Sequence, residues 1–473
     1  MKFFGRELEL NKMCELLKKE TASLVVIKGR RRIGKSRLTL EFGKKFARVL
    51  SFSGSPPSNG LNAQDQRDDF AGQMSRSLKM PQFKTEDWGD LFFYLAKETA
   101  KGQVLIILDE INWIGDKDPT FLGKLKTAWD QYFSKNPKLI LILCGSLSGW
   151  IEKNIITNTG FVGRISKTLT LEELPLSVCD LFWKSYRNKI SVFEKFKFLS
   201  ISGGVPKYLE EMLPEKPTEK NILDLCFQRD GFLFNEFEQL FHDLFSKKSP
   251  KYKTILRALA TGPKDLENIY QALRLKKTGY IVSEYMDDLE EGGFIQRDYT
   301  WNVAQERKSK LSAYRLSDNY SRFYLKYIEP KKERIMRNSI TKVPSFECIL
   351  GLQFENLVLN NRQRIYELLS IDPATIIFDN PYFQTATKRQ QGCQIDYMIQ
   401  TEHGVLYVVE IKFSKRKVPA LICKEMQEKI SQLATQKNLS VRPVLLHVNG
   451  ISDALKKSGY FTNVLNFSNL LSK

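Results

Sequence analysis

The segment from Gly29 to Ser36 constrains the fold of this chain more than any other. It reads Gly-Arg-Arg-Arg-Ile-Gly-Lys-Ser, so four residues separate its two glycines and a Lys-Ser pair follows the second. The apolar run 23–28 precedes it, and an amphipathic helix is predicted to begin near Lys35. A glycine-rich turn between a buried strand and a helix points backbone N–H groups toward an anion. The segment therefore predicts a phosphate-binding loop.

The residues of this loop have distinct expected roles. Lys35 should reach the β- and γ-phosphates of a nucleotide, and Ser36 should ligate Mg²⁺. The residues expected to contact the nucleotide here are Gly29, Arg30, Arg31, Arg32, Ile33, Gly34, Lys35, Ser36 and Arg37. We therefore expect ATP or ADP as the ligand and Mg²⁺ as the cofactor.

A second predicted strand, 104–108, ends in two acidic residues. Asp109 is expected to hold the magnesium ion and its water shell, and Glu110 to orient the water that attacks the γ-phosphate. Lys35 and Glu110 are thus the predicted catalytic residues of an ATPase. The alternative is an acidic pair at a strand end that only helps to start a helix.

Three apolar runs, 23–28, 104–108 and 139–144, are rich in Val, Ile and Leu and are separated by amphipathic helices. This pattern predicts strands buried on both faces of a parallel α/β sheet, and the segment 51–64 predicts a surface loop at its edge. Three helix-length segments and a hairpin further along the chain predict a winged helix. The expected domains are a nucleotide-binding core at 1–170, a helical lid at 171–246, a winged helix at 247–330, a basic linker at 331–345 and a C-terminal α/β domain at 346–473.

The C-terminal domain carries two predicted strands, 394–400 and 404–412, joined by a hairpin turn. The turn fixes a register that places Asp396 opposite Glu410, and the alternation of side chains puts Asp396, Glu410 and Lys412 on one face. Opposed carboxylates repel unless a cation lies between them. We expect Asp396 and Glu410 to ligate Mg²⁺ and Lys412 to position water or stabilise a transition state. The alternative is a solvated hairpin face.

Several segments together resemble the archaeal-type ATPase family of the STAND and AAA+ division of P-loop proteins. They are Phe4-Gly5-Arg6-Glu7, the phosphate loop, Asp109-Glu110, Cys144-Gly145-Ser146, Gly163-Arg164 and Gly203-Gly204-Val205-Pro206. The resemblance implies that Gly5 and Arg6 lie near the adenine and that Pro206 packs on the base. It also implies that the Arg164 side chain interacts with the γ-phosphate. The alternative is that Arg164 is a surface cation. Ser146 resembles the sensor-one residue of AAA-type ATPases, or it is a helix N-cap.

An acid followed on the next strand by Glu-x-Lys resembles the PD-(D/E)XK nuclease family. The predicted order of helix, three strands, helix and strand after residue 346 matches that family's restriction-endonuclease-like fold. Glu355, on the leading helix, matches the family's helix-borne acid, which can ligate a second metal ion. The resemblance implies a metal-dependent endonuclease, and the alternative is a nuclease fold that has lost its activity.

The net charge of +19 favours a polyanionic partner. We expect DNA, contacted by the segment 276–280 at the start of a recognition helix and by the wing residues Arg297, Arg307, Lys308 and Lys310. The alternative is a winged helix that only packs between the switch and its effector.

The remaining composition narrows the class of protein. Seven scattered cysteines argue against a disulfide framework, and three histidines argue against a His-based metal site. No apolar run is long enough for a membrane helix, so a cytoplasmic protein is expected. The sequence predicts an ATP-dependent switch protein coupled to a nuclease-like domain acting on DNA. One alternative is a DNA-binding or protein-scaffolding ATPase whose nuclease fold is inactive. Another is a protein that acts on a protein target, with a positive charge that only serves solubility. A homo-oligomer or a complex with a protein partner is compatible with each of these interpretations.

Overall fold

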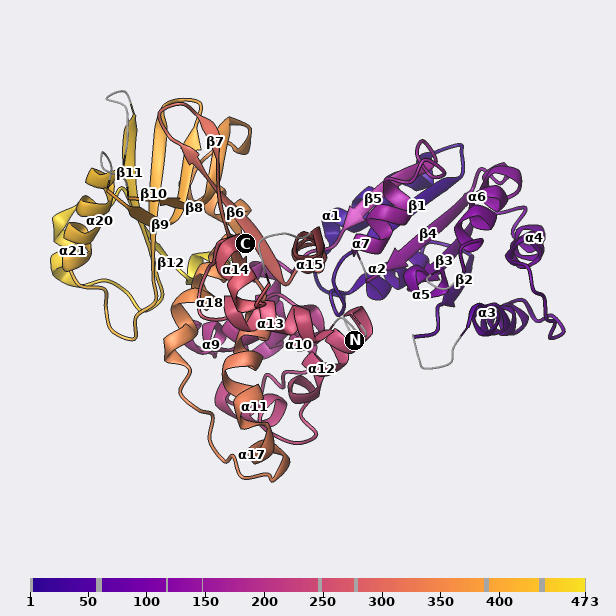
Figure 1. Cartoon of the computed structure of the whole chain (residues 1–473), viewed down its shortest axis with the longest axis horizontal. Coiled ribbons are helices and arrows are strands. Elements are labelled where there is room, and N and C mark those ends of the chain that lie inside the picture. Colours follow the sequence, from indigo (N-terminus) through magenta and orange to yellow (C-terminus); the bar gives the residue numbers. More distant parts are fainter. Residues whose placement is uncertain are drawn as a thin grey trace. The chain divides into compact units, whose positions relative to one another are not determined.

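The computed structural model describes residues 3–56, 62–115, 118–146, 148–245, 249–275, 280–386, 391–433 and 439–472. The chain forms two compact units, which we describe separately (Figure 1). The N-terminal unit comprises residues 1–172, 239–249 and 284–293, and the C-terminal unit comprises 173–238, 250–283 and 294–473.

The N-terminal unit is built on a five-stranded, all-parallel sheet in the order β2-β3-β4-β1-β5. Its strands are β1 (Ser23–Lys28), β2 (Arg48–Ser53), β3 (Val104–Asp109), β4 (Leu139–Gly145) and β5 (Ile165–Thr170). The three central strands are the predicted apolar runs, and they are apolar throughout because helices cover both faces. The predicted parallel α/β fold is confirmed.

Two apolar cores hold helices against the two faces of this sheet. The helices are α1 (Glu7–Cys14), α2 (Lys35–Gly43), α3 (Ala63–Leu78), α4 (Trp88–Glu98), α5 (Ile111–Gly115), α6 (Phe121–Gln131) and α7 (Ser148–Ile151). One core contains Phe70 of α3, Trp88 of α4 and Phe121 of α6. The other contains Met13 of α1 and Phe42 of α2. The helix that follows the phosphate loop is thereby fixed to the sheet.

The segment 51–64 differs at its two ends from the predicted surface loop. Residues 51–53 belong to edge strand β2, in which Leu50 and Phe52 are buried and Val49, Ser51 and Ser53 are exposed. Alternation of this kind is typical of a strand at a sheet edge. Asn62 caps α3 with its side chain. Residues 54–56 belong to no helix or strand, and residues 57–61 lie outside the described residues.

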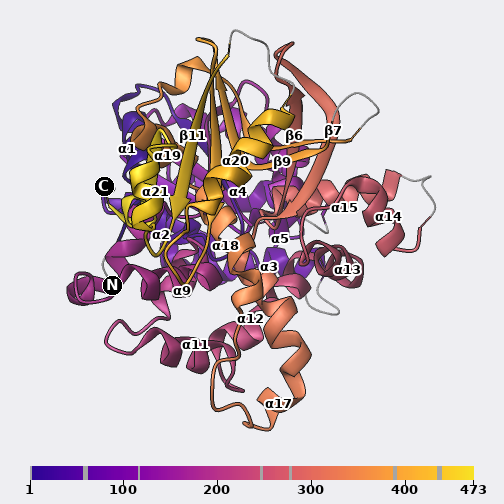
Figure 2. The same cartoon turned by 90° about the vertical axis from the view of Figure 1, so that its left-hand side faces the viewer.

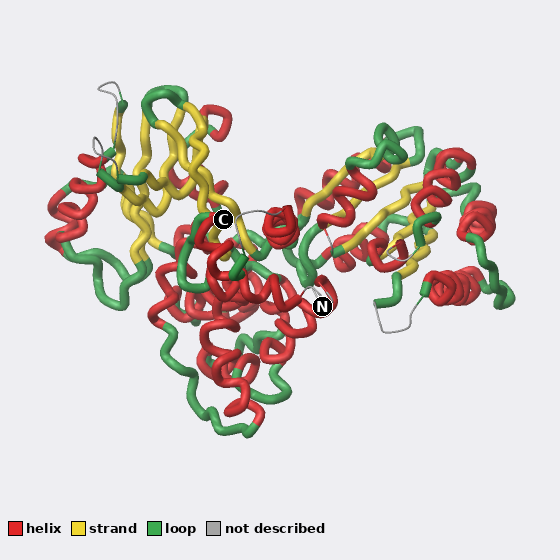
Figure 3. The backbone as a smooth tube through the Cα atoms, in the orientation of Figure 1, coloured by secondary structure: helices red, strands yellow, loops and turns green. Residues whose placement is uncertain are grey.

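The predicted lid is helical, and Figure 3 shows its helices in red, joined by loops in green. These helices are α8 (Leu176–Cys179), α9 (Val192–Ser202), α10 (Pro206–Glu210), α11 (Thr218–Cys226), α12 (Phe232–Phe245), α13 (Ser249–Leu259), α14 (Leu266–Ala272) and α15 (Tyr280–Glu291). Three helices and a hairpin follow one another as predicted for a winged helix. However, 284–293 belongs to the N-terminal unit, so this segment is not one compact domain.

A second five-stranded sheet lies in the C-terminal unit, in the order β12-β11-β10-β9-β8. Its strands are β8 (Ile376–Gln384), β9 (Cys393–Thr401), β10 (Val405–Lys412), β11 (Ser440–His447) and β12 (Asn463–Asn466). β9 is antiparallel to both of its neighbours, whereas β10, β11 and β12 run parallel. The predicted order of helix, three strands, helix and strand is present.

The helices after α15 are α16 (Asn319–Phe323), α17 (Lys332–Met336), α18 (Glu347–Leu359), α19 (Arg362–Leu369), α20 (Leu421–Gln432), α21 (Asp453–Ser458) and α22 (Ser468–Leu471). Of these, α18 contacts β10, α20 contacts β9 and α22 contacts β12. Figure 2 shows α20 lying across the strands, and Ile422 and Met426 of α20 share a core with Ile395 and Val408. The face that carries Glu410 is therefore covered by a helix rather than solvated.

The hairpin of β6 (Ile295–Asn302) and β7 (Arg307–Leu316) packs against this second sheet. The Trp301 ring stacks on Phe378 with centroids 5.2 Å apart, and its Nε1 donates to Oε1 of Gln400 at 2.7 Å. The β6–β7 hairpin of the predicted winged helix thus shares a hydrophobic core with the predicted C-terminal domain. The predicted linker 331–345 contains the short helix α17. Within the described ranges, the structure has no helix of the length and apolar character needed to span a membrane.

Candidate functional site

The phosphate loop adopts a conformation that its glycines make possible. Gly29 has a φ of 151°, and a Cβ at this position would lie 2.4 Å from the carbonyl oxygen of Leu171. Arg32 and Gly34 are left-handed, with φ of 71° and 93°. α2 begins at Lys35 without a side-chain cap, so the N–H groups of its first turn face the loop. This arrangement of backbone donors suits a phosphate.

Two side chains of the loop lie as their expected roles require. The Lys35 ammonium spans the loop and donates to the carbonyl oxygens of Gly29 at 2.8 Å and Arg30 at 3.0 Å. The Ser36 hydroxyl donates to Oδ2 of Asp109 at 2.7 Å. The two predicted magnesium ligands therefore meet. Among the other loop residues, Arg30 and Ile33 are buried, whereas Arg31, Arg32 and Arg37 are half-buried.

Glu110 and Ser146 are also brought together. The Ser146 hydroxyl donates to Oε2 of Glu110 at 2.7 Å, and its backbone N–H donates to the same oxygen at 3.2 Å. Both residues follow neighbouring parallel strands, so they lie at one carboxyl edge with the phosphate loop. Glu110 has a φ of 49°, a left-handed conformation uncommon for this residue type, and such strain is concentrated at functional sites.

Arg6 ties the N-terminal segment to the phosphate loop. Its guanidinium donates to the carbonyl oxygen of Ile33 at 3.2 Å and to that of Glu172, and it pairs with Glu9 at 2.9 Å. Gly5 has a φ of 71°, which directs the chain into this contact. The sequence did not predict a contact between Arg6 and Ile33, because the two residues are far apart along the chain.

Arg164 differs from its expected placement. It precedes β5, and β5 runs parallel to β1 with Ile165 beside Leu24. Arg164 is thus at the amino edge of the sheet, whereas the phosphate loop leaves the carboxyl edge about 20 Å away. Its Nε donates to Oδ1 of Asp130 at 2.7 Å and its Nη2 donates to Oδ2 at 2.9 Å. This pairing lowers the pKa of Asp130 to about 2. Arg164 does not reach the phosphate loop of its own chain.

Pro206 and the expected DNA-binding residues lie in other parts of the chain. Pro206 is the first residue of α10, in the C-terminal unit. The expected recognition segment 276–280 is outside the residues whose side chains the structure describes. On the hairpin, the Lys308 ammonium lies 3.4 Å from the Tyr299 ring centroid and Arg297 lies 4.8 Å from it, so cations and an aromatic ring share one face.

The predicted register of the C-terminal hairpin is confirmed. Val409 pairs with Tyr397 and Val408 with Met398, and the next step places Asp396 opposite Glu410. Oδ2 of Asp396 accepts a hydrogen bond from the backbone N–H of Ile411 at 2.8 Å, which fixes its carboxyl group beside β10.

Glu410 is almost fully buried, at 1% exposed, and both of its carboxylate oxygens bind lysines. The Lys412 ammonium lies 2.9 Å from Oε1, and the Lys429 ammonium donates to Oε2 at 2.6 Å. Lys429 was not among the predicted site residues because it comes from α20. Its spacing from Ile422 and Met426 puts it on the buried face of that helix, and a lysine there indicates a buried anionic partner.

Burial and repulsion raise the pKa values of Asp396 and Glu355. Desolvation raises the pKa of Asp396 to about 6, and the nearby Glu410 charge adds to the effect. Desolvation also raises the pKa of Glu355 to about 7, with a further contribution from Asp396. The structure thus brings Glu355 of α18 close to the two strand acids, as the sequence predicts for a helix-borne acid.

The donor chemistry of this cluster fits Mg²⁺, since carboxylate oxygens are its preferred ligands. Burial raises the pKa values of Asp396 and Glu355, and the neighbouring carboxylates add to this, so a bound cation would stabilise the charged forms of both groups. However, in the described part of the chain no three His, Cys, Asp or Glu side chains are arranged to hold a metal ion. Lys412 and Lys429 bind the Glu410 oxygens in the present arrangement. Metal binding here therefore requires these side chains to move.

Comparison with known proteins identifies the N-terminal part of the chain. Residues 3–212 match a family described as an ATPase domain predominantly from Archaea. This part of the chain is an archaeal-type ATPase domain with a P-loop fold. An uncharacterised protein of Methanocaldococcus jannaschii is 29% identical over 361 residues, which span 75% of this chain and 76% of that protein.

One solved structure has the same fold. The Walker-type ATPase of Pyrococcus abyssi matches 68% of this chain and 96% of its own, with a TM-score of 0.51 and 19% identity. The similarity shows a common fold. The ORC2 protein of Aeropyrum pernix, solved as ADPNP and ADP complexes, matches 70% of this chain and 91% of its own at 14% identity. Its TM-score of 0.38 is too low to support a structural conclusion.

Proposed function

We propose that this protein is an ATP-hydrolysing switch coupled to a Mg²⁺-dependent, nuclease-like domain that acts on DNA. The contact of Ser36 with Asp109, beside that of Ser146 with Glu110, carries the first half of this proposal. A triphosphate bound along the loop would contact Lys35, and Glu110 would orient a water molecule toward it. Mg²⁺ held by Ser36 and Asp109 would neutralise charge on the phosphates.

The nuclease half of the proposal rests on the opposed acids of β9 and β10. Asp396 and Glu410, with Glu355 beside them, would hold Mg²⁺, which when bound supplies an activated water. Lys412 ends β10 next to Glu410 and would position that water or stabilise charge on the phosphodiester. A net charge of +19 favours DNA as the polyanion.

An aromatic cluster supports coupling between the lid and these acids. Phe196 of α9 stacks on Phe413 with ring centroids 5.2 Å apart and meets Phe354 at 5.3 Å. Phe413 directly follows Lys412, and Phe354 directly precedes Glu355. Movement of α9 would therefore be transmitted by packing to α18, which carries Glu355, and to β10, which carries Glu410.

The test is cleavage of DNA in Mg²⁺, with and without ATP, by the full chain. We expect the native protein to cleave DNA and the variants Asp396→Asn and Lys412→Ala to be inactive. Cleavage by Lys35→Ala should no longer depend on ATP. Lys456→Ala, at an exposed position on α21, is the control for loss of one positive charge. Cleavage that persists undiminished in Lys412→Ala would show that the nuclease assignment is wrong.

The pairing of Lys429 with Glu410 favours a second candidate function, an ATPase whose nuclease-like domain binds DNA without cleaving it. In that case the two lysines replace a metal ion permanently, and DNA binding is unchanged by a chelator. Binding of labelled DNA with EDTA and with Mg²⁺ separates the two functions, because a nuclease site gains affinity for the phosphodiester when the metal ion bridges it to the acids.

A further inference from the structure

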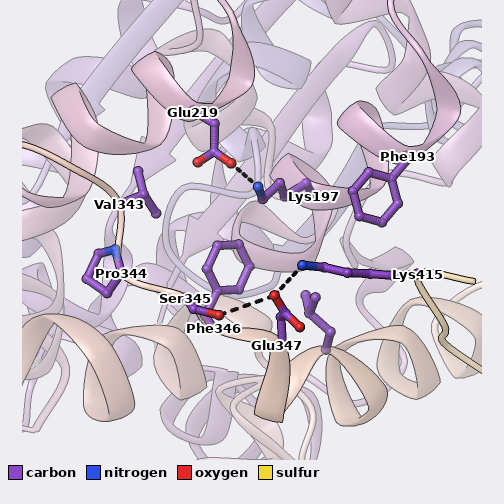
Figure 4. A pocket seen from close by; sticks show the side chains of 10 residues that line it. Phe193, Lys197, Glu219, Val343, Pro344, Ser345, Phe346, Glu347 and Lys415 are labelled. Atoms are coloured by element: carbon purple, nitrogen blue, oxygen red, sulfur yellow. Dashed lines mark hydrogen bonds and ion pairs between the residues drawn. The ribbon is translucent and has the colours of Figure 1, made fainter.

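A cavity of about 260 Å³ lies in the C-terminal unit, beside the loop that follows the candidate catalytic lysine and β10. The opposed acids do not line it. Lys415, which follows Lys412 by three residues, lines it. The other walls come from α9, α11, the segment 343–346 and the start of α18, as Figure 4 shows. The cavity is thus formed by the lid helices and the nuclease-like domain together.

Aromatic rings form the apolar part of this cavity. Phe193 of α9 and Phe346 both line it. The Phe193 ring also stacks on Phe413, with an angle of 18° between the ring planes. Since Phe413 is bonded to Lys412, the aromatic wall is attached directly to the strand end that carries the candidate catalytic lysine. Flat apolar walls of this kind suit a planar ring.

Two cations project into the same cavity from separate elements (Figure 4). Lys197 of α9 pairs with Glu219, and Lys415 pairs with Glu347. Burial and the neighbouring charge of Lys415 lower the pKa of Lys197, so the two ammonium groups lie near enough to repel. Partly exposed ion pairs of this kind contribute little to stability, so an anionic ligand can displace either carboxylate from its lysine at small cost.

These groups match the parts of one nucleotide. The rings would receive an unstacked base, the two ammonium groups its flanking phosphates, and the carboxylates of Glu219 and Glu347 would accept from an exocyclic amino group. We propose that this cavity, defined by Phe193, Lys197, Glu219, Phe346, Glu347 and Lys415, holds one splayed nucleotide of a single nucleic-acid strand. The proposal rests on the proposed function in that it takes nucleic acid as the substrate of the adjoining site.

The test measures binding of a fluorescein-labelled single-stranded oligodeoxycytidylate to the full chain by fluorescence anisotropy in EDTA, so that no cleavage takes place. We expect the double variant Lys197→Met/Lys415→Met to bind about tenfold more weakly, and the slope of log affinity against log salt to fall by about 1.4, or 0.7 for each lost phosphate contact. The matched control Lys456→Met/Lys457→Met removes the same charge from α21 and should change affinity less than twofold. Lys197→Arg/Lys415→Arg should restore binding.

Two further experiments, photo-crosslinking and competition by a free mononucleotide, identify the ligand. An oligonucleotide with 5-iodocytosine should photo-crosslink to the peptide that contains Phe193 or Phe346, and Phe193→Leu should reduce the yield. Equal weakening by the cavity variant and its control, or crosslinks confined to other segments, would overturn the proposal. Competition by free dCMP as strong as by the oligonucleotide would also overturn it, because the ligand would then be a mononucleotide. Failure of Mg²⁺-dependent cleavage with these binding results intact would refute the nuclease and leave the cavity assignment standing.

Discussion

The ammonium group of Lys429 lies 2.6 Å from Oε2 of Glu410, and the two residues come from different elements, α20 and β10. Lys412 binds the other oxygen of the same carboxylate. A buried carboxylate that faces Asp396 across the hairpin is thereby compensated by two cations. This relationship explains how the protein tolerates two opposed acids in its interior.

Replacement of Lys429 by Met is expected to have opposite effects on stability and metal binding. Without metal, Glu410 keeps only Lys412 as a partner, and loss of a hydrogen bond to a buried charge should cost about 1–3 kcal/mol in denaturation with EDTA present. The freed oxygen should in turn raise Mn²⁺ affinity severalfold in calorimetric titrations. Lys424→Met, an exposed change on the same helix, is the control. Weaker Mn²⁺ binding in Lys429→Met would count against Glu410 as a metal ligand.

Glu355→Gln should stabilise the metal-free protein in a way that depends on pH. The folded pKa of Glu355 is about 7, above the ordinary value of 4.5, so this group favours folding at low pH and that contribution is lost as pH rises through 7. The variant and the native protein should be about equally stable at pH 4, and the variant more stable by about 3 kcal/mol at pH 8. Glu402→Gln, on the exposed hairpin turn, should show no such trend. Urea denaturation in EDTA at both pH values decides the matter.

ATP hydrolysis should depend on Glu110 and Ser146 and not on Arg164. Glu110→Gln should lower the hydrolysis rate by about two orders of magnitude with ATP affinity nearly unchanged, since the side chain acts on water. Ser146→Ala removes the hydroxyl that holds Oε2 of Glu110 and should slow hydrolysis by about tenfold. Arg164→Ala should leave the rate of the single chain intact, because this side chain pairs with Asp130 at the far edge of the sheet. A steady-state phosphate-release assay beside nucleotide-binding measurements would show whether this ranking is right.

Trp301 is expected to hold the β6–β7 hairpin to the C-terminal sheet. Trp301→Ala removes a stacked ring from the core and leaves Oε1 of Gln400 without its donor, a change that should cost about 3–5 kcal/mol. Trp301→Phe keeps the ring and should cost less. Hydrogen exchange measured by mass spectrometry should show faster exchange in β8 and β9 for Trp301→Ala than for Trp301→Phe. Unaltered exchange in both variants would mean that the hairpin and the sheet are energetically independent.

Local pattern in the sequence determined a large part of this structure. The strands β1, β3 and β4 are continuous apolar runs because a parallel sheet buries both faces, and the phosphate loop is specified by glycines at fixed spacing. The hairpin turn at Gly404 fixed the register that places Asp396 opposite Glu410, since a short turn leaves one way to pair the strands. Each of these features depends on residues that are close together along the chain.

Packing between distant segments decided the rest. Lys429 reaches Glu410, Trp301 enters the C-terminal core, and Arg164 lies at the amino edge beside Asp130 because of how whole elements are placed against one another. A single sequence contains no spacing rule that links such positions. Contacts of this kind are set by the shape and burial of packed surfaces, which exist only once the elements have come together.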